Sequence, residues 1–201
     1  FLFATLGCLA GGRLTSYIHA ALDIGWRDWS KLWFWGLLTH SLLDAFTLYG
    51  TQLFNPFSDY PVALSTVFII DPLYTLPLLI LLLMALGHPP GARARRRLNA
   101  AGLIISSSYL LLTGANALHV RAQFTEGLAQ NNIAHQRLFA TPTPLNNILW
   151  MGIAESEDAL YVGLYSLFDA ELPTHFRRIE KNAALVNPYQ THRPLRRLNW
   201  F

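Results

Sequence analysis

Four stretches of consecutive apolar residues, separated by polar connectors, dominate the first part of the chain. They cover residues 1–10, 32–48, 66–86 and 98–118. A helix that crosses a bilayer needs about 20 mostly apolar residues. The third and fourth stretches have that length, while the second is shorter and carries polar side chains. We expect a membrane span at each of the four, the first being the remainder of a longer helix.

The pattern changes after residue 119. Residues 148–154 and 159–168 are rich in Tyr, Val, Ile and Trp and flank the polar segment 155–158, which predicts a β-hairpin. The Thr-Pro-Thr-Pro sequence at 141–144 predicts an extended breaker before it. Residues 176–184 predict a short helix.

Together these patterns predict a mainly α fold. Residues 1–119 would form a polytopic helical membrane domain, and residues 120–201 a small extramembrane α+β appendage at the C-terminal end. Because the chain starts inside an apolar stretch and stops at residues 198–201 without a tapering tail, we expect it to be a fragment truncated at both ends.

Composition and charge agree with a membrane protein. Only 13% of the residues are charged, against roughly 25% in soluble domains. The positive-inside rule predicts cytoplasmic connectors at 11–31 and 87–97 and an outer connector at 49–65, which places residues 120–201 on the outer side of the membrane as well. This distribution explains the net charge of +3 without a nucleic-acid partner. Within residues 1–119, every lysine and arginine lies in those two basic connectors: Arg13, Arg27, Lys31, Arg93, Arg95, Arg96 and Arg97.

His40 and Asp44 are the best candidates for chemistry. Residues four apart on a helix share one face, and an imidazole nitrogen and a carboxylate oxygen both suit zinc. Ionisable residues inside a span are costly and usually face protein or water. Two interpretations stay open: a pair of ligands to one divalent metal ion, or a structural hydrogen bond between helices.

Two further aspartates are weaker candidates. Asp71 precedes Pro72, which predicts a helix N-cap followed by a first-turn proline, and it could also serve a site at the outer face. Asp59 ends a Gly- and Pro-containing connector that could line a polar mouth above the pair. His19 and Asp23 repeat the spacing in a basic connector, and we interpret that repeat as coincidence.

The segment 39–53, with His40 and Asp44 in it, resembles the YdjM-type family of bacterial inner-membrane proteins, which are described as metal-dependent hydrolases. The resemblance continues through 56–59 and 68–75 and extends to 141–144 and 165–167. The family is distantly similar to zinc-dependent phospholipase C and to single-strand nucleases of the same helical architecture.

The resemblance implies that His40 and Asp44 match the downstream histidine–aspartate motif of the family. Its early acidic motif and its His-Arg-x-x-x-His-Ser motif would precede Phe1 and supply the remaining ligands. The implied function is a membrane-bound hydrolase that uses a divalent metal, zinc above all. Its substrate would be a phosphoester or another lipid-like envelope molecule, and membrane lipid its partner. Asp44 and Asp71 would be the catalytic carboxylates. The alternative is a non-enzymatic membrane protein, serving transport, proton relay or partner binding, in which His40 and Asp44 form a structural pair.

Overall fold

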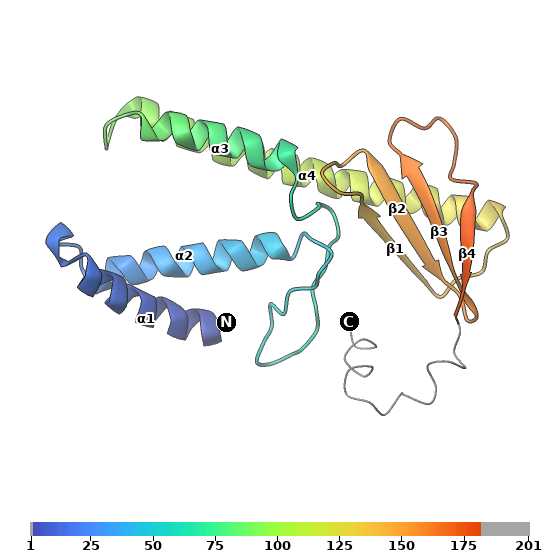
Figure 1. The fold of residues 1–201 in the computed structure, drawn as a ribbon, viewed down its shortest axis with the longest axis horizontal. Coiled ribbons are helices and arrows are strands. Elements are labelled where there is room, and N and C mark those ends of the chain that lie inside the picture. Colours follow the sequence, from blue (N-terminus) through green and yellow to red (C-terminus); the bar gives the residue numbers. More distant parts are fainter. Residues whose placement is uncertain (1, 182–201) are drawn as a thin grey trace. The chain divides into compact units, whose positions relative to one another are not determined.

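A computed structural model describes the backbone of residues 2–181 and the side chains of residues 5–181. The chain divides into two compact units, Phe1–Leu64 and Ser65–Phe201. Each unit has its own packing, and Figure 1 labels the elements of both.

The first unit is built on a helical hairpin. Helix α1 (Leu2–Ile18) leads through a 3-10 turn, η1 (Ala20–Leu22), into helix α2 (Trp26–Asp44). The two helices approach closely where α1 lacks side chains: a Cβ on Gly12 would collide with Ser30, and a Cβ on Gly11 would lie 2.9 Å from the Trp33 ring. After α2 the connector folds back, and the backbone N–H of Leu64 donates to the carbonyl of Ala45 over 2.8 Å.

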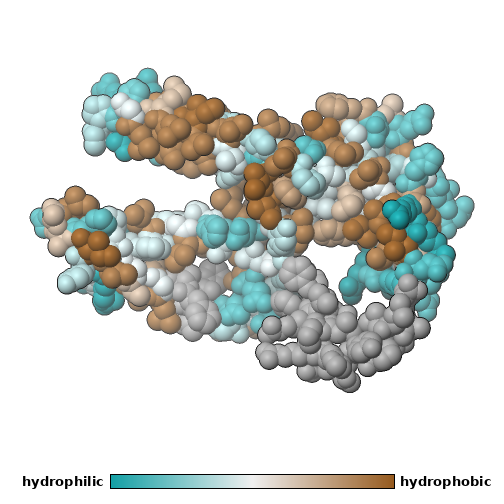
Figure 2. Space-filling model, in the orientation of Figure 1, coloured by the Kyte–Doolittle hydropathy of each residue, from teal (hydrophilic) through white to brown (hydrophobic). Residues whose placement is uncertain are grey.

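A second helical hairpin opens the other unit. Helix α3 (Pro72–Leu86) and helix α4 (Arg93–Gln130) pack against each other. Gly102 lies at this contact, where a Cβ would meet the side chains of Leu78 and Leu81 at 3.5 Å, an ordinary van der Waals distance. Leucine and isoleucine side chains cover most of the outer surface of α3, which Figure 2 shows in brown along the upper arm, with hydrophilic residues at its tip.

A four-stranded antiparallel sheet follows α4. Its strands are β1 (Arg137–Pro142), β2 (Leu149–Glu155), β3 (Ala159–Ser166) and β4 (Phe176–Glu180), and they pair in chain order. One face packs on the last part of α4, where Val120, Phe124, Trp150 and Tyr165 form the buried core. Gly152 leaves room for the Phe124 ring, which a Cβ would approach within 2.6 Å.

The predicted polytopic helical membrane domain is wrong. Of the helices in the described part of the chain, only α4 is long and apolar enough to cross a membrane. Helix α3 begins at Pro72, so its 15 residues extend only about 22 Å at 1.5 Å per residue, less than the roughly 30 Å hydrocarbon core. Glycines, charges and hydroxyls interrupt α1 and α2.

The sheet corrects a second prediction. The hairpin expected from 148–154 and 159–168 is confirmed as β2 and β3. The short helix expected at 176–184 is wrong for residues 176–180, which form the edge strand β4, paired with β3. Residues 182–184 lie outside the described part. Helix α4 also continues past Leu118 to Gln130, because Val120 and Phe124 pack into the sheet.

Candidate functional site

His40 and Asp44 lie in the last turn of α2 and point the same way. The Nε2 atom of His40 is 3.5 Å from an Oδ of Asp44, and the two side chains are 75% and 49% exposed. A pair that tied two helices together would be enclosed between them. The contact is therefore intrahelical, set by the four-residue spacing, and both side chains keep free surface for a ligand.

Apolar grooves flank the pair within the first unit. One, of about 550 Å³, lies along one face of α2, is bordered by Thr15 of α1 and ends at His40. The side chains that line it are Thr15, Trp29, Leu32, Trp33, Leu37 and His40, together with Gly36. A second groove, of about 240 Å³, lies between the end of α2 and the connector 51–54. Its lining is also mainly apolar, and Asp59, which is exposed, is not part of it.

The packing of α1 on α2 determines which part of α1 lies beside His40 and Asp44. Gly12 faces Ser30, Gly11 faces Trp33, and a Cβ on Gly7 would lie 3.6 Å from Leu37. The helices are thus antiparallel, and this register continues toward the start of α1 as α2 runs toward His40. The beginning of α1 therefore lies level with the histidine–aspartate turn.

The donor geometry of the pair fits two ligands of one metal ion. Two ligand atoms at about 2.0–2.2 Å from a tetrahedral zinc lie roughly 3.3–3.5 Å apart, and the His40–Asp44 separation is 3.5 Å. Within residues 2–181, however, no group of three or more His, Cys, Asp and Glu side chains is arranged to hold a metal. The described residues thus bring two donor atoms of His40 and Asp44 close together, without a third beside them.

Asp71 is buried at the start of α3, in the second unit. One carboxylate oxygen accepts the backbone N–H of Leu73 over 2.9 Å, and the other accepts the hydroxyl of Tyr109 over 2.8 Å. The predicted N-cap with its first-turn proline, Pro72, is confirmed. Both oxygens are already engaged, and the bond to Tyr109 ties the start of α3 to the middle of α4.

The second His-x-x-x-Asp segment has a different geometry. His19 lies before η1 and stacks on the Trp29 ring with centroids 5.8 Å apart, whereas Asp23 follows η1 in the left-handed region at φ 51°. The two residues therefore do not share a helix face. His119, at the end of the apolar part of α4, lies 3.4 Å from the Tyr165 hydroxyl.

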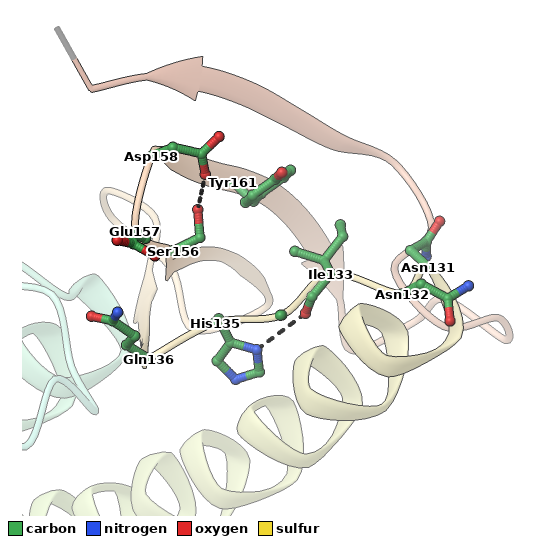
Figure 3. A pocket seen from close by; sticks show the side chains of 10 residues that line it. Asn131, Asn132, Ile133, His135, Gln136, Ser156, Glu157, Asp158 and Tyr161 are labelled. Atoms are coloured by element: carbon green, nitrogen blue, oxygen red, sulfur yellow. Dashed lines mark hydrogen bonds between the residues drawn. The ribbon is translucent and has the colours of Figure 1, made fainter.

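A polar groove in the second unit escaped the sequence analysis. It measures about 530 Å³ and lies between residues 131–136, which follow α4, and the β2–β3 turn (Figure 3). Ser156 donates to Asp158 over 2.9 Å, and Arg178 donates to the other Asp158 oxygen over 2.6 Å. The hydrogen bond from Arg178 lowers the pKa of Asp158. In the sequence, the polar segment 155–158 predicted only a turn and did not indicate a groove.

Glu155, beside that groove, is also paired. Lys181 donates to its carboxylate over 2.6 Å, and this hydrogen bond lowers the pKa of Glu155. Cations therefore hold the carboxylates of Asp158 and Glu155, while Glu157 and His135 also line the groove.

Comparison with known proteins gives a family match to the helical part of the chain. A model of the YdjM inner membrane protein family matches residues 1–120, which include α1, α2, α3 and the apolar part of α4. The match ends before the sheet, so segments 141–144 and 165–167 lie outside it. No curated protein and no solved structure gives a significant match. Since the matched residues make up more than half of the chain and include the histidine–aspartate turn, the chain belongs to the YdjM inner membrane protein family.

Proposed function

We propose that this protein is a divalent-metal-dependent hydrolase that acts at the membrane on an amphiphilic substrate, a phosphoester in the first instance. His40 and Asp44 are two of its metal ligands. The observation that carries the proposal is the 3.5 Å pair on an open helix face, with an apolar groove ending at the histidine.

The exposure of the pair favours ligands over a structural tie. A buried His–Asp bond would stabilise packing by satisfying both groups internally. Here His40 and Asp44 are 75% and 49% exposed, so they add little to packing and remain available to a metal ion.

The YdjM-type resemblance predicts that further ligands come from an acidic motif and a His-Arg-x-x-x-His-Ser motif, which would precede Phe1. The antiparallel register of α1 on α2, seen at Gly7–Leu37 and Gly11–Trp33, supports this source, because it brings the start of α1 level with His40.

The residues around the histidine–aspartate pair have distinct roles in the proposed reaction. Nε2 of His40 and an Oδ of Asp44 would hold the metal ion, and their four-residue separation on α2 fixes the spacing between them. The groove lined by Trp29, Trp33 and Leu37 binds the apolar portion of the substrate and excludes water beside the pair. A bound divalent ion supplies Lewis acidity and lowers the pKa of water toward ~7.

The catalytic role expected for Asp71 is not part of this proposal. Its two oxygens hold Leu73 and Tyr109, and an acid–base role would require one of these bonds to break. The catalytic role of Asp71 therefore stays a prediction from the sequence.

Metal content tests the proposal. The full-length protein is purified in detergent without chelators, with zinc supplied, and analysed for elements beside His40→Ala, Asp44→Asn and the control His19→Ala, which alters the other His-x-x-x-Asp segment. The proposal predicts near-stoichiometric metal in wild type and control, and its loss in both variants with unchanged circular dichroism. Absence of metal from the wild type, or its retention in His40→Ala, contradicts the proposal. A metal-loaded protein is then assayed for hydrolysis of phospholipid phosphoesters.

A further inference from the structure

The sheet beyond α4 carries an apolar rim at one end. Four large side chains there are exposed to 57%, 39%, 37% and 82%: Leu145, Ile148, Leu149 and Phe168. They come from the β1–β2 loop, from the first residue of β2 and from the segment after β3. The backbone N–H of Leu167 donates to the carbonyl of Ile148 over 3.0 Å, which joins the two segments.

Hydrogen bonds hold this rim at the level of Asn116 on α4. The side-chain amide of Asn116 donates to the Oδ1 of Asn147 over 2.8 Å, and Asn147 in turn donates to the carbonyl of Thr66 over 2.8 Å. Asn147 is buried and lies between Leu145 and Ile148 in the same loop. The rim therefore cannot slide along α4 without breaking the hydrogen bond between Asn116 and the buried Asn147.

Position 116 is where the apolar part of α4 ends. No charged residue occurs between Arg97 and Asn116, and these 19 steps extend about 28 Å at 1.5 Å per residue, close to the roughly 30 Å hydrocarbon core. Only 17% of the apolar window of α4 is buried within the chain, which is typical of a helix surrounded by lipid and unlike the core helix of a soluble domain.

The backbone at Leu145 adds an independent indication. Its φ of 65° lies in the left-handed region, which glycine and asparagine adopt at lower cost than leucine. In water, an exposed leucine at this position costs free energy in two ways, through its left-handed backbone and through the exposure of its apolar side chain. An apolar side chain becomes favourable there if the loop meets lipid.

We propose that this rim, Leu145, Ile148, Leu149 and Phe168, inserts into the bilayer interface, so that the sheet rests on the membrane from which α4 emerges. The partner is the lipid surface itself. Asp169 and Glu171, both exposed, follow Phe168, so burial of apolar area and not attraction to anionic headgroups drives the contact. This inference is independent of the metal site.

Depth measurements with nitroxide labels test the contact. In a Cys8→Ser background, single cysteines replace Leu145, Phe168 or, as the control, the exposed Glu157 at the opposite end of the same strands. The full chain is reconstituted in vesicles of phosphatidylethanolamine with or without phosphatidylglycerol. Collision rates with oxygen and with a water-soluble nickel chelate are then compared.

The proposal predicts that oxygen collisions exceed nickel collisions at Leu145→Cys and Phe168→Cys in both lipid mixtures, with the reverse at Glu157→Cys. Nickel collisions as frequent at the rim as at Glu157→Cys would overturn it, since the rim would then lie in water. Protection of the rim labels from both reagents would also overturn it, because a protein would then cover the rim.

Discussion

The two helical hairpins of this chain differ in where they place polar groups, which lie on the surface in α1–α2 and in the interior in α3–α4. In α1–α2 the helices meet through Gly11 and Gly12, and His40 and Asp44 face outward. In α3–α4 the outward residues are mainly leucine and isoleucine, while Asp71, Ser106 and Thr113 are buried.

This contrast follows from the surroundings that each hairpin requires. Ser106 and Thr113 donate to carbonyls of their own helix, and Asp71 accepts from Leu73 and Tyr109. Internal satisfaction of every polar group is the condition for contact with hydrocarbon. The α1–α2 hairpin instead leaves an ionisable pair exposed, which requires water or a ligand. The α3–α4 hairpin thus satisfies its buried polar groups internally, whereas the α1–α2 hairpin exposes its ionisable pair.

Asp71→Ala should give the largest effect on the α3–α4 hairpin. It removes the N-cap and leaves the hydroxyl of Tyr109 and the N–H of Leu73 without their acceptor. We expect a loss of about 3 kcal/mol in the free energy of unfolding, measured by denaturant titration in detergent. Tyr109→Phe, which removes one of the two bonds, should cost roughly half as much. Equal stability of wild type and Asp71→Ala would show that the hairpin does not depend on internal satisfaction.

A matched pair of glycine substitutions tests the α1–α2 contact. Gly12→Ala places a Cβ against the side chain and backbone of Ser30, whereas a Cβ on Gly36 meets nothing within 4 Å. Gly12→Ala should destabilise the protein by about 2 kcal/mol. Gly36→Ala should stabilise α2 by roughly 0.5–1 kcal/mol. Unfolding curves followed by tryptophan fluorescence distinguish the two, and a stabilising Gly12→Ala would contradict the close packing.

Sequence reasoning succeeded where the signal is local. The Asp71-Pro72 cap and the β2–β3 hairpin both depend on a few adjacent residues. Tertiary context decided the rest. Phe176–Glu180 became a strand because β3 offers an unpaired edge, and α4 continued because Phe124 has a core to enter. The His40–Asp44 pair was visible as a spacing, but its exposure was not, because exposure depends on how α1 packs.

The smallest effect is expected at the sheet. The hydrogen bond from Lys181 lowers the pKa of Glu155 below its ordinary 4.5 in the folded chain. The resulting stabilisation is complete above that value and is lost as pH falls through the lowered folded pKa. Glu155→Gln should therefore be slightly less stable than wild type at pH 7, and the difference should shrink as the pH falls through the lowered pKa of Glu155. A difference that does not change as the pH falls would assign the effect to packing.

The central claim, that His40 and Asp44 together bind a metal, is tested most directly by cobalt substitution. Cobalt(II) reports its coordination through visible absorption, so the full-length protein in detergent is titrated with Co²⁺ beside His40→Ala, Asp44→Asn and His19→Ala. We predict saturable tetrahedral bands at one equivalent in wild type and His19→Ala, displaced by zinc, and their loss in the other two variants. Bands that survive in both His40→Ala and Asp44→Asn, or a wild type that shows only hexaaquo cobalt, would contradict the claim.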